Sequence, residues 1–263
     1  MNDFVVRERF GATMVIRLNR PERRNAFDLD VRKGIADAVV EARDDDSVHA
    51  VVITGTDGIF CAGGDLKSLS QAKRPVFKDR DRIRRLHHWF HHLVNLEKPV
   101  IAAVDGPAFG AGFNLALACD FVLATPRARF CAVFGRIGLV PDLGGFFLLP
   151  RIVGLQRAKD LVFSAREVEA EEARQLGIVM QLVEPQRLMD EALLLASRYH
   201  DASTEALGIA KNILNRSFNL DQDTLAELEA NAQALALHTT YHDEAVEAFL
   251  AKRPLRFKGV PQP

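Results

Sequence analysis

Short apolar runs alternate with amphipathic stretches through the first half of the chain, and this alternation limits the fold more than any other feature. Strands are expected in four segments: 4–20, which would hold two short strands around Gly11, and then 49–55, 99–106 and 120–125. Helices are expected between them, over 29–45, 80–98 and 110–119. Repeated strand–helix alternation of this kind predicts an α/β core.

The pattern changes after Leu155. From there the apolar residues recur mostly at helical spacing, and helices are expected over 156–165, 169–177, 186–200, 204–217 and 222–253. Two helix ends have local signals. Asp28 is a candidate N-cap for the helix over 29–45, and Pro99 is expected to stop the helix over 80–98.

Composition excludes several classes of protein. The 263 residues have a net charge of -1, so no excess of Lys and Arg favours nucleic acid. No apolar run reaches the roughly 18–20 residues of a membrane helix. Charges are scattered over residues 1–20, so we expect no signal peptide. Three cysteines without metal or redox spacing fit a reducing cytoplasm.

Two glycine-rich junctions follow predicted strands, TGTDGIFCAGGDLKSL at 54–69 and VDGPAFGAGFNLALA at 104–118. Small residues let a ligand approach the backbone, and free N–H groups there can bind an anion or a developing oxyanion. Tight packing of a strand against a helix would also require glycine. Neither junction contains the phosphate-loop or the dinucleotide-binding pattern.

A lone carboxylate stands out in GLVPDLGG, at 138–145. Asp142 lies there between apolar residues and glycines, just after the mostly apolar FCAVFGRI. By itself, an Asp in this setting is as compatible with a helix N-cap as with a functional group.

Together these segments resemble the crotonases, the enoyl-CoA hydratase/isomerase superfamily. The resemblance covers nearly the whole chain, and its further motifs are RPERRNAF (20–27), ACDFVLAT (118–125), IGLVPDLGG (137–145) and EAFLAKRPLRF (247–257). It implies an α/β fold with a spiral ββα core over 1–200 and a helical trimerisation region over 201–263. It also implies a homotrimer or a hexamer, and an acyl-CoA substrate of the kind used in fatty acid metabolism, with no separate cofactor.

The resemblance assigns the reacting groups by position. The backbone amides of Gly64 and Ala111 match an oxyanion hole that holds the thioester oxygen. Hydratases of the family use two glutamates, and those positions are Asn114 and Phe134 here; neither side chain can act as a base. Asp142 matches the base of ring-1,2-epoxyphenylacetyl-CoA isomerases and Δ3,Δ2-enoyl-CoA isomerases. An apolar wall around Asp142 should raise its pKa.

The remaining candidates bind the two ends of the substrate. Coenzyme A contacts are implied for Arg23, Arg24, Ala26, Ala62, Asp65, Leu66, Phe249 and Lys252, the last two toward a neighbouring subunit. An acyl pocket is implied for Trp89, Phe109, Asn114, Phe134 and Leu139.

A histidine-rich stretch, LHHWFHHL, offers a metal-site alternative. His87/His91 and His88/His92 have the i, i+4 spacing that can hold a metal on a helix, but no third ligand is evident. We therefore expect no metal site, and histidines that face solvent or a subunit contact. The neighbouring basic run KDRDRIRR (78–85) is expected to be a solvated helix face.

The favoured function is isomerisation of an enoyl-CoA double bond with Asp142 as acid and base. One alternative is a hydratase, with weak activity. An alternative of another class is a non-catalytic acyl-CoA-binding protein, and such a protein would not need the carboxylate of Asp142.

Overall fold

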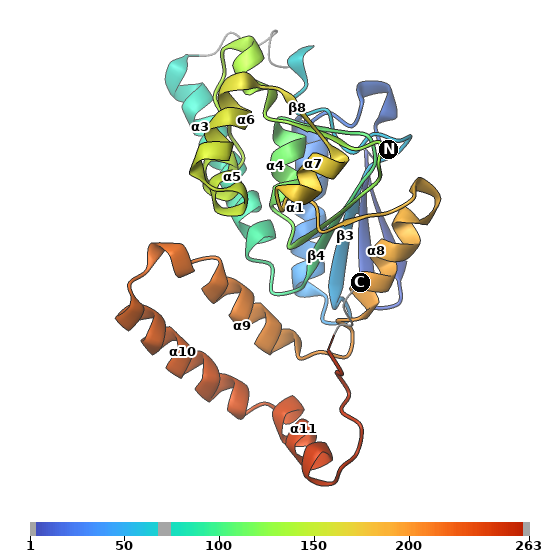
Figure 1. Ribbon diagram of the computed structural model, residues 1–263, viewed down its shortest axis with the longest axis vertical. Helices are drawn as coiled ribbons and strands as arrows, with labels where there is room; N and C mark the ends of the chain where they lie inside the picture. Colours follow the sequence, from blue (N-terminus) through green and yellow to red (C-terminus); the bar gives the residue numbers. More distant parts are fainter. Residues whose placement is uncertain (1–3, 68–74, 260–263) are drawn as a thin grey trace.

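The computed structural model describes residues 4–67 and 75–259 (Figure 1). Its centre is a six-stranded sheet in the order β1-β2-β3-β4-β6-β9. The strands are β1 Val5–Phe10, β2 Thr13–Leu18, β3 Ala50–Thr54, β4 Val100–Val104, β6 Phe121–Ala124 and β9 Gln181–Leu182. β1 and β2 form the expected antiparallel hairpin around Gly11, and the other neighbours in this sheet are parallel.

Helices cover both faces of this sheet, which explains its uninterrupted apolar strands. In β3, Val51 and Ile53 belong to one core cluster, while Ala50 and Val52 belong to another. The first cluster includes side chains of α1 Leu29–Asp44, α3 Val76–Val94 and α4 Ala111–Leu117. The second is closed by α8 Leu188–Ser197.

A smaller sheet lies beside the start of α4. It contains β5 Pro107–Phe109, β7 Arg129–Cys131 and β8 Glu167–Glu169, in that order. The sequence pattern missed it because strands of three residues are too short to show a period. The Gly110 N–H donates to the Cys131 carbonyl oxygen at 2.8 Å, which continues the β5–β7 pairing to the residue before α4.

The remaining helices divide into two groups. Those that belong to the core are α5 Gly145–Val153, α6 Leu155–Ser164 and α7 Ala170–Gln175. The others form an arm that extends away from the core (Figure 1), made of α9 Thr204–Leu214, α10 Gln222–Leu237 and α11 Thr240–Leu250. Short 3-10 turns are η1 Pro21–Arg23, η2 Val133–Ile137, η3 Pro185–Arg187 and η4 Ser217–Asn219.

Helix ends agree with the sequence only in part. Asp28 is confirmed as an N-cap, because its side chain accepts from the Val31 N–H at 2.9 Å. α3 ends at Val94, well before Pro99, and the Asn95 side chain there donates to the His91 carbonyl oxygen.

The stretch 222–253 is mostly helical, as expected. Two helices occupy this stretch, because Thr239 adopts an extended backbone and caps α11 with its hydroxyl.

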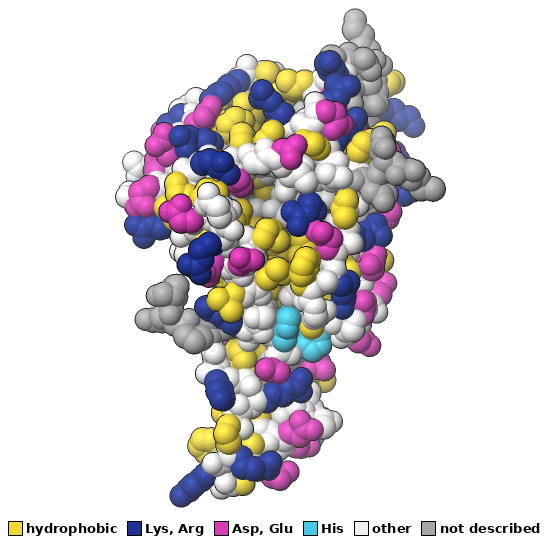
Figure 2. All heavy atoms as spheres, turned by 90° about the vertical axis from the view of Figure 1, so that its right-hand side faces the viewer, with side chains coloured by type: hydrophobic (Ala, Val, Ile, Leu, Met, Phe, Trp, Pro, Cys, Tyr) yellow, Lys and Arg dark blue, Asp and Glu magenta, His cyan; other side chains and the backbone are white. Residues whose placement is uncertain are grey.

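The surface carries mixed charge. Figure 2 shows Lys and Arg side chains interspersed with Asp and Glu over one face of the molecule. Within 4–67 and 75–259, no helix combines the length and the apolar character that a bilayer crossing requires. The three cysteines are buried and form no disulfide.

Candidate active site

The two glycine-rich junctions lie side by side. The Cys61 N–H donates to the Pro107 carbonyl oxygen at 3.0 Å, and the Phe109 N–H donates to the Cys61 carbonyl oxygen at 2.9 Å. Gly112, in the first turn of α4, packs directly on this segment, since a Cβ there would lie 2.3 Å from the Cys61 oxygen. The glycine therefore allows α4 to begin against the first junction. The last residues of that junction, 68 and 69, lie outside the described residues.

This packing brings the predicted oxyanion donors to neighbouring positions. Gly63 has a φ of +93°, and a Cβ on it would lie 3.5 Å from the Ala111 nitrogen. Gly64 follows directly. Neither the Gly64 N–H nor the Ala111 N–H donates to any residue within the described ranges. Two adjacent amides of this kind can donate to one oxygen of a ligand, and such donors stabilise a developing oxyanion.

The predicted coenzyme A contacts of the core also come together. The segment that holds Arg23, Arg24 and Ala26 runs beside the first junction: the Ala62 N–H donates to the Arg24 carbonyl oxygen at 3.0 Å, and the Asp65 N–H donates to that of Phe27 at 3.0 Å. Arg23, Arg24 and Leu66 are exposed. Asp65 is buried, and its carboxylate accepts from the Lys67 N–H at 2.9 Å.

A buried asparagine fixes this loop. Asn25 adopts a left-handed φ of +54° and is fully buried. Its side-chain amide donates to the Ile59 carbonyl oxygen at 2.7 Å, and its side-chain oxygen accepts from the Arg20 N–H at 2.8 Å. The exposed Arg23, which ends η1, and Arg24, which follows it, are thus held by a hydrogen-bonded turn.

Phe249 and Lys252 lie elsewhere. Phe249 belongs to α11 and is 71% exposed, and Lys252 is exposed just after this helix. The arm carries both residues to the end of the molecule opposite α4 and α5 (Figure 1). Within one chain, they are not part of the group around Gly64.

Asp142 lies between η2 and α5, and it does not cap the helix that follows. The N-cap of α5 is Gly144, with no side-chain cap, so the helix-cap interpretation is wrong. Asp142 is half-buried, and its Oδ1 is buried without a hydrogen-bond partner among the described residues. Burial raises the pKa of this carboxyl, and the positive charges of Arg32, Arg82 and His87 oppose the rise.

Asn114 holds the segment that carries Asp142. Its side-chain amide donates to the Asp142 backbone carbonyl oxygen at 2.8 Å. Asn114 is 2% exposed, and a Cβ on Gly145 would lie 2.7 Å from its Nδ2, so the start of α5 packs on the amide. The sequence indicated only a pocket position for Asn114, because its partner is a backbone atom 28 residues away.

The predicted apolar wall forms in part. Phe134 is 8% exposed. Its ring lies close to the residue before Ala111, since a Cβ added to Gly110 would lie 3.7 Å from the Phe134 Cζ atom. Trp89 is half-buried, with its ring centre 6.5 Å from that of Phe27. Leu139 is 50% exposed. Phe109 is the half-buried last residue of β5.

The four histidines of α3 are exposed. His91 Nδ1 lies 3.1 Å from the Asn95 side-chain amide. Across the described part of the chain, no three His, Cys, Asp or Glu side chains form a group that could hold a metal ion.

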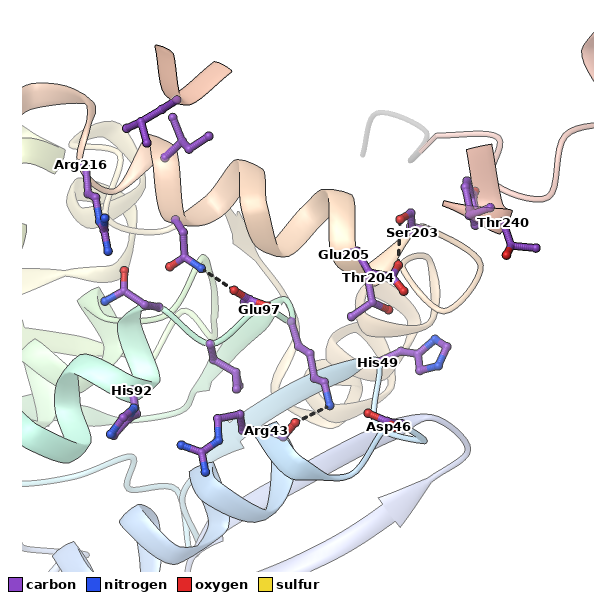
Figure 3. Close-up of a pocket in the computed structure, with 18 of the residues that line it drawn as sticks. Arg43, Asp46, His49, His92, Glu97, Ser203, Thr204, Glu205, Arg216 and Thr240 are labelled. Atoms are coloured by element: carbon purple, nitrogen blue, oxygen red, sulfur yellow. Dashed lines mark hydrogen bonds between the residues drawn. The ribbon is translucent and has the colours of Figure 1, made fainter. Parts of the chain in front are cut away.

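A cavity of about 1100 Å³ lies between the arm and the core (Figure 3). Polar contacts lie in its wall: Asn212 of α9 donates to Glu97 at 3.1 Å, and Lys98 donates to the Ala42 carbonyl oxygen at 2.6 Å. None of the predicted site residues line it. It is separate from the group formed by Gly64, Ala111 and Asp142.

The strand order and the paired junctions define a crotonase-type α/β fold. The sequence profile described as "Enoyl-CoA hydratase/isomerase" matches residues 8–260. The chain belongs to this family.

Relatives with both activities are similar to it. The 1,2-epoxyphenylacetyl-CoA isomerase of Escherichia coli K12 is 36% identical over 98% of this chain and 100% of its own length. The short-chain-enoyl-CoA hydratase of Clostridium acetobutylicum is 34% identical over 95% of this chain and 96% of its own. The crystal structure of an enoyl-CoA hydratase/isomerase from Cupriavidus metallidurans superposes with a TM-score of 0.94, at 43% identity over 99% and 98% of the two chains.

Proposed function

We propose that this enzyme shifts the double bond of a 3-enoyl-CoA to give a 2-enoyl-CoA, with Asp142 as the acid and base. The observation that carries the proposal is the Asp142 carboxyl itself: it is half-buried, one of its oxygens has no partner among the described residues, and it does not cap α5. Its segment is bound through Asn114 to α4, the helix that begins at Ala111.

The chemistry needs one carboxylate and one oxyanion site. The Asp142 carboxylate removes a proton from C2 of the thioester, and the electron pair moves through the thioester carbonyl onto its oxygen. The Gly64 and Ala111 amides stabilise this charge, and losing one such donor typically costs on the order of 10²–10³ in rate. The protonated Asp142 then returns the proton at C4. No electron or group is transferred to a cofactor, so coenzyme A enters only as part of the substrate.

The environment of Asp142 suits this task. A carboxyl whose pKa is raised by burial is a stronger base than one in water. Once protonated, it also loses the proton to water less readily than a carboxyl with a depressed pKa would, so the proton remains available for C4. Proton transfer by a positioned group contributes roughly 10²–10⁴ to the rate.

Hydration is the second candidate, because several relatives are named as hydratases. The side chains at the two glutamate positions oppose it. Asn114 donates its amide to a backbone carbonyl, and Phe134 is a buried phenyl ring. Neither can remove a proton from water, so we expect hydration to be slow.

A panel of enoyl-CoA thioesters tests the proposal. Purified enzyme is incubated with 3-hexenoyl-CoA and with 2-hexenoyl-CoA, and the products are analysed by mass and by double-bond position. Isomerisation leaves the mass unchanged, whereas hydration adds one water. Rapid hydration of 2-hexenoyl-CoA without isomerisation would contradict the proposal, and binding without any conversion would favour an acyl-CoA-binding protein.

We further propose that the arm assembles the protein into a trimer or a hexamer. Large apolar side chains of the arm are exposed, namely Leu214, Phe218, Leu235, Phe249 and Leu250. A second copy would cover them and bring Phe249 and Lys252 to a neighbour's coenzyme A. A monomer by light scattering would refute this, and deletion from about residue 220 onward should abolish assembly. The three buried thiols fit a reducing cytoplasm.

A further inference from the structure

A basic groove lies between α1 and α3, next to the proposed base. It encloses about 400 Å³. Its described lining consists of five positive side chains and four apolar residues, without any carboxylate: Arg32, Lys33, Lys78, Arg82, Arg85, Leu29, Ala36, Leu86 and Trp89. Such a lining offers apolar contacts for a short hydrocarbon chain and positive charges for an anion.

The cations are only partly neutralised by the protein. Arg82 Nε lies 3.3 Å from the Asp79 carboxylate. Lys33, Lys78 and Arg85 form no ion pair with any residue of the described ranges. Like charges gathered on two facing helices repel one another, so an anion bound between them would relieve this repulsion.

A buried donor adds to the groove. The indole Nε1–H of Trp89 is buried and has no acceptor among the described residues. A buried donor without an acceptor is costly, and native proteins pair most of them. Trp89 therefore supplies a donor without a partner beside the cations that line the groove.

The groove adjoins the acyl side of the site. Arg32 and Arg82 line it, and their positive charges also act on the Asp142 carboxyl. Trp89 packs against Phe27, whose carbonyl oxygen accepts from the Asp65 N–H next to Gly64. The arginines implied for coenzyme A, Arg23 and Arg24, are absent from its lining.

We propose that this groove binds an oxyanion carried by the acyl-CoA, namely a carboxylate at the far end of its acyl group, so that the enzyme prefers dicarboxylic acyl-CoA thioesters. The inference rests on the proposed function, because it assumes that the acyl group of the substrate lies beside Asp142. The half-buried guanidiniums of Arg32 and Arg82 bind the carboxylate, and guanidinium geometry matches a carboxylate well. The exposed Lys33, Lys78 and Arg85 attract it.

Binding of two saturated thioesters tests this without any turnover. Hexanoyl-CoA and adipyl-CoA have acyl chains of six carbons, and only adipyl-CoA ends in a carboxylate. By titration calorimetry on the full chain, adipyl-CoA should bind about tenfold more tightly, as expected for charge-assisted hydrogen bonds. Arg32→Gln and Arg82→Gln, made separately, should each remove most of this preference. Arg157→Gln on exposed α6 is the matched control and should keep it.

The outcomes are distinct. Equal affinity for the two thioesters in the wild-type protein would overturn the inference. A parallel loss of affinity for adipyl-CoA, hexanoyl-CoA and free coenzyme A in both arginine variants would assign the groove to the coenzyme A phosphates and would also overturn it. A preference for adipyl-CoA without isomerisation of 3-enoyl-CoA would leave the inference standing and refute only the proposed function.

Discussion

The side-chain amide of Asn114 donates a 2.8 Å hydrogen bond to the backbone carbonyl oxygen of Asp142. The resemblance to the family's hydratases implies a glutamate at the position of Asn114. An ionised glutamate there would face a carbonyl oxygen and, beyond it, another carboxylate. An amide donor instead fixes the segment that carries the only acid proposed to act on the substrate.

The first prediction concerns Asp142→Asn. This change keeps the side-chain shape and removes the proton acceptor, so conversion of 3-enoyl-CoA to 2-enoyl-CoA should fall at least roughly 10²-fold. Exchange of the C2 protons of a bound saturated thioester with deuterated solvent should fall with it. Affinity for that thioester should persist, because the Gly64 and Ala111 amides are unchanged. Full isomerisation by the folded variant would exclude Asp142 as the base.

The same variant should be at least as stable as the wild type at pH 7. The folded-state pKa of Asp142 is raised by burial above its unfolded value. The folded state therefore binds this proton more tightly than the unfolded state does. As pH rises from the unfolded-state pKa of Asp142 through its folded-state pKa, the proton is lost and the protein becomes less stable. Thermal unfolding of both proteins at pH 7 checks this; a large loss of stability in Asp142→Asn would contradict the assigned environment.

The second prediction follows from the same shift. Asp142 must be ionised to act as a base, so log(kcat/KM) for isomerisation should decrease at low pH. The midpoint of this decrease, the acid limb of the pH profile, should lie above the ordinary Asp pKa of about 3.9. Arg32, Arg82 and His87 hold this pKa down against the effect of burial. Arg82→Gln should therefore move the acid limb to higher pH. An unchanged acid limb in Arg82→Gln would show that Arg82 does not lower the pKa of Asp142.

The sequence predicted the central sheet well, because strands buried on both faces consist of unbroken apolar residues such as those of β3 and β4. It could not predict the small sheet, whose strands of three residues have no readable period. The two glycine-rich junctions lie side by side because each follows a strand of the central sheet, whereas Leu139 remains 50% exposed. The roles of Asn114 and Arg32 were missed because the partners of each lie far away in sequence.

The third prediction separates positioning from chemistry. Asn114→Asp removes the donor to the Asp142 carbonyl and adds a second buried carboxyl. It should lower kcat for isomerisation and move the acid limb of the pH profile to higher pH, since like charges raise each other's pKa. KM should change less. An effect on stability alone, with kcat and the pH profile unchanged, would reduce Asn114 to a packing role.

The fourth prediction concerns the contact between the two junctions. A Cβ on Gly112 would lie 2.3 Å from the Cys61 carbonyl oxygen, a backbone atom that cannot move aside. Gly112→Ala should therefore separate the Gly64 and Ala111 amides and abolish isomerisation, although Ala is the better helix former. The control is Gly135→Ala, whose Cβ would meet its nearest atom at an ordinary 3.5 Å. An active Gly112→Ala enzyme would contradict the arrangement of the junctions.

The last prediction concerns the joint between the arm and the core. Lys211 of α9 donates to the Asp120 carboxylate at 2.7 Å, and that carboxylate also accepts from the Val100 N–H at 2.7 Å. Burial raises the pKa of Asp120, while Lys211 opposes the rise. Lys211→Met would leave the Asp120 carboxylate, whose side chain is 23% exposed, without its cation and should lower the free energy of unfolding by about 1 kcal/mol.

Chemical unfolding measures this loss, and hydrogen exchange locates it. Exchange should become faster in α9 and unchanged in the central strands β3 and β4. Lys159→Met, on exposed α6, is the matched control and should change neither quantity. Asp120→Asn should be milder than Lys211→Met, because a neutral amide leaves no unpaired charge and its side-chain oxygen can still accept from the Val100 N–H. Because both variants break the ion pair, the reverse order would mean that the charged acceptor for the Val100 N–H, rather than an unpaired carboxylate, dominates the stability of the joint.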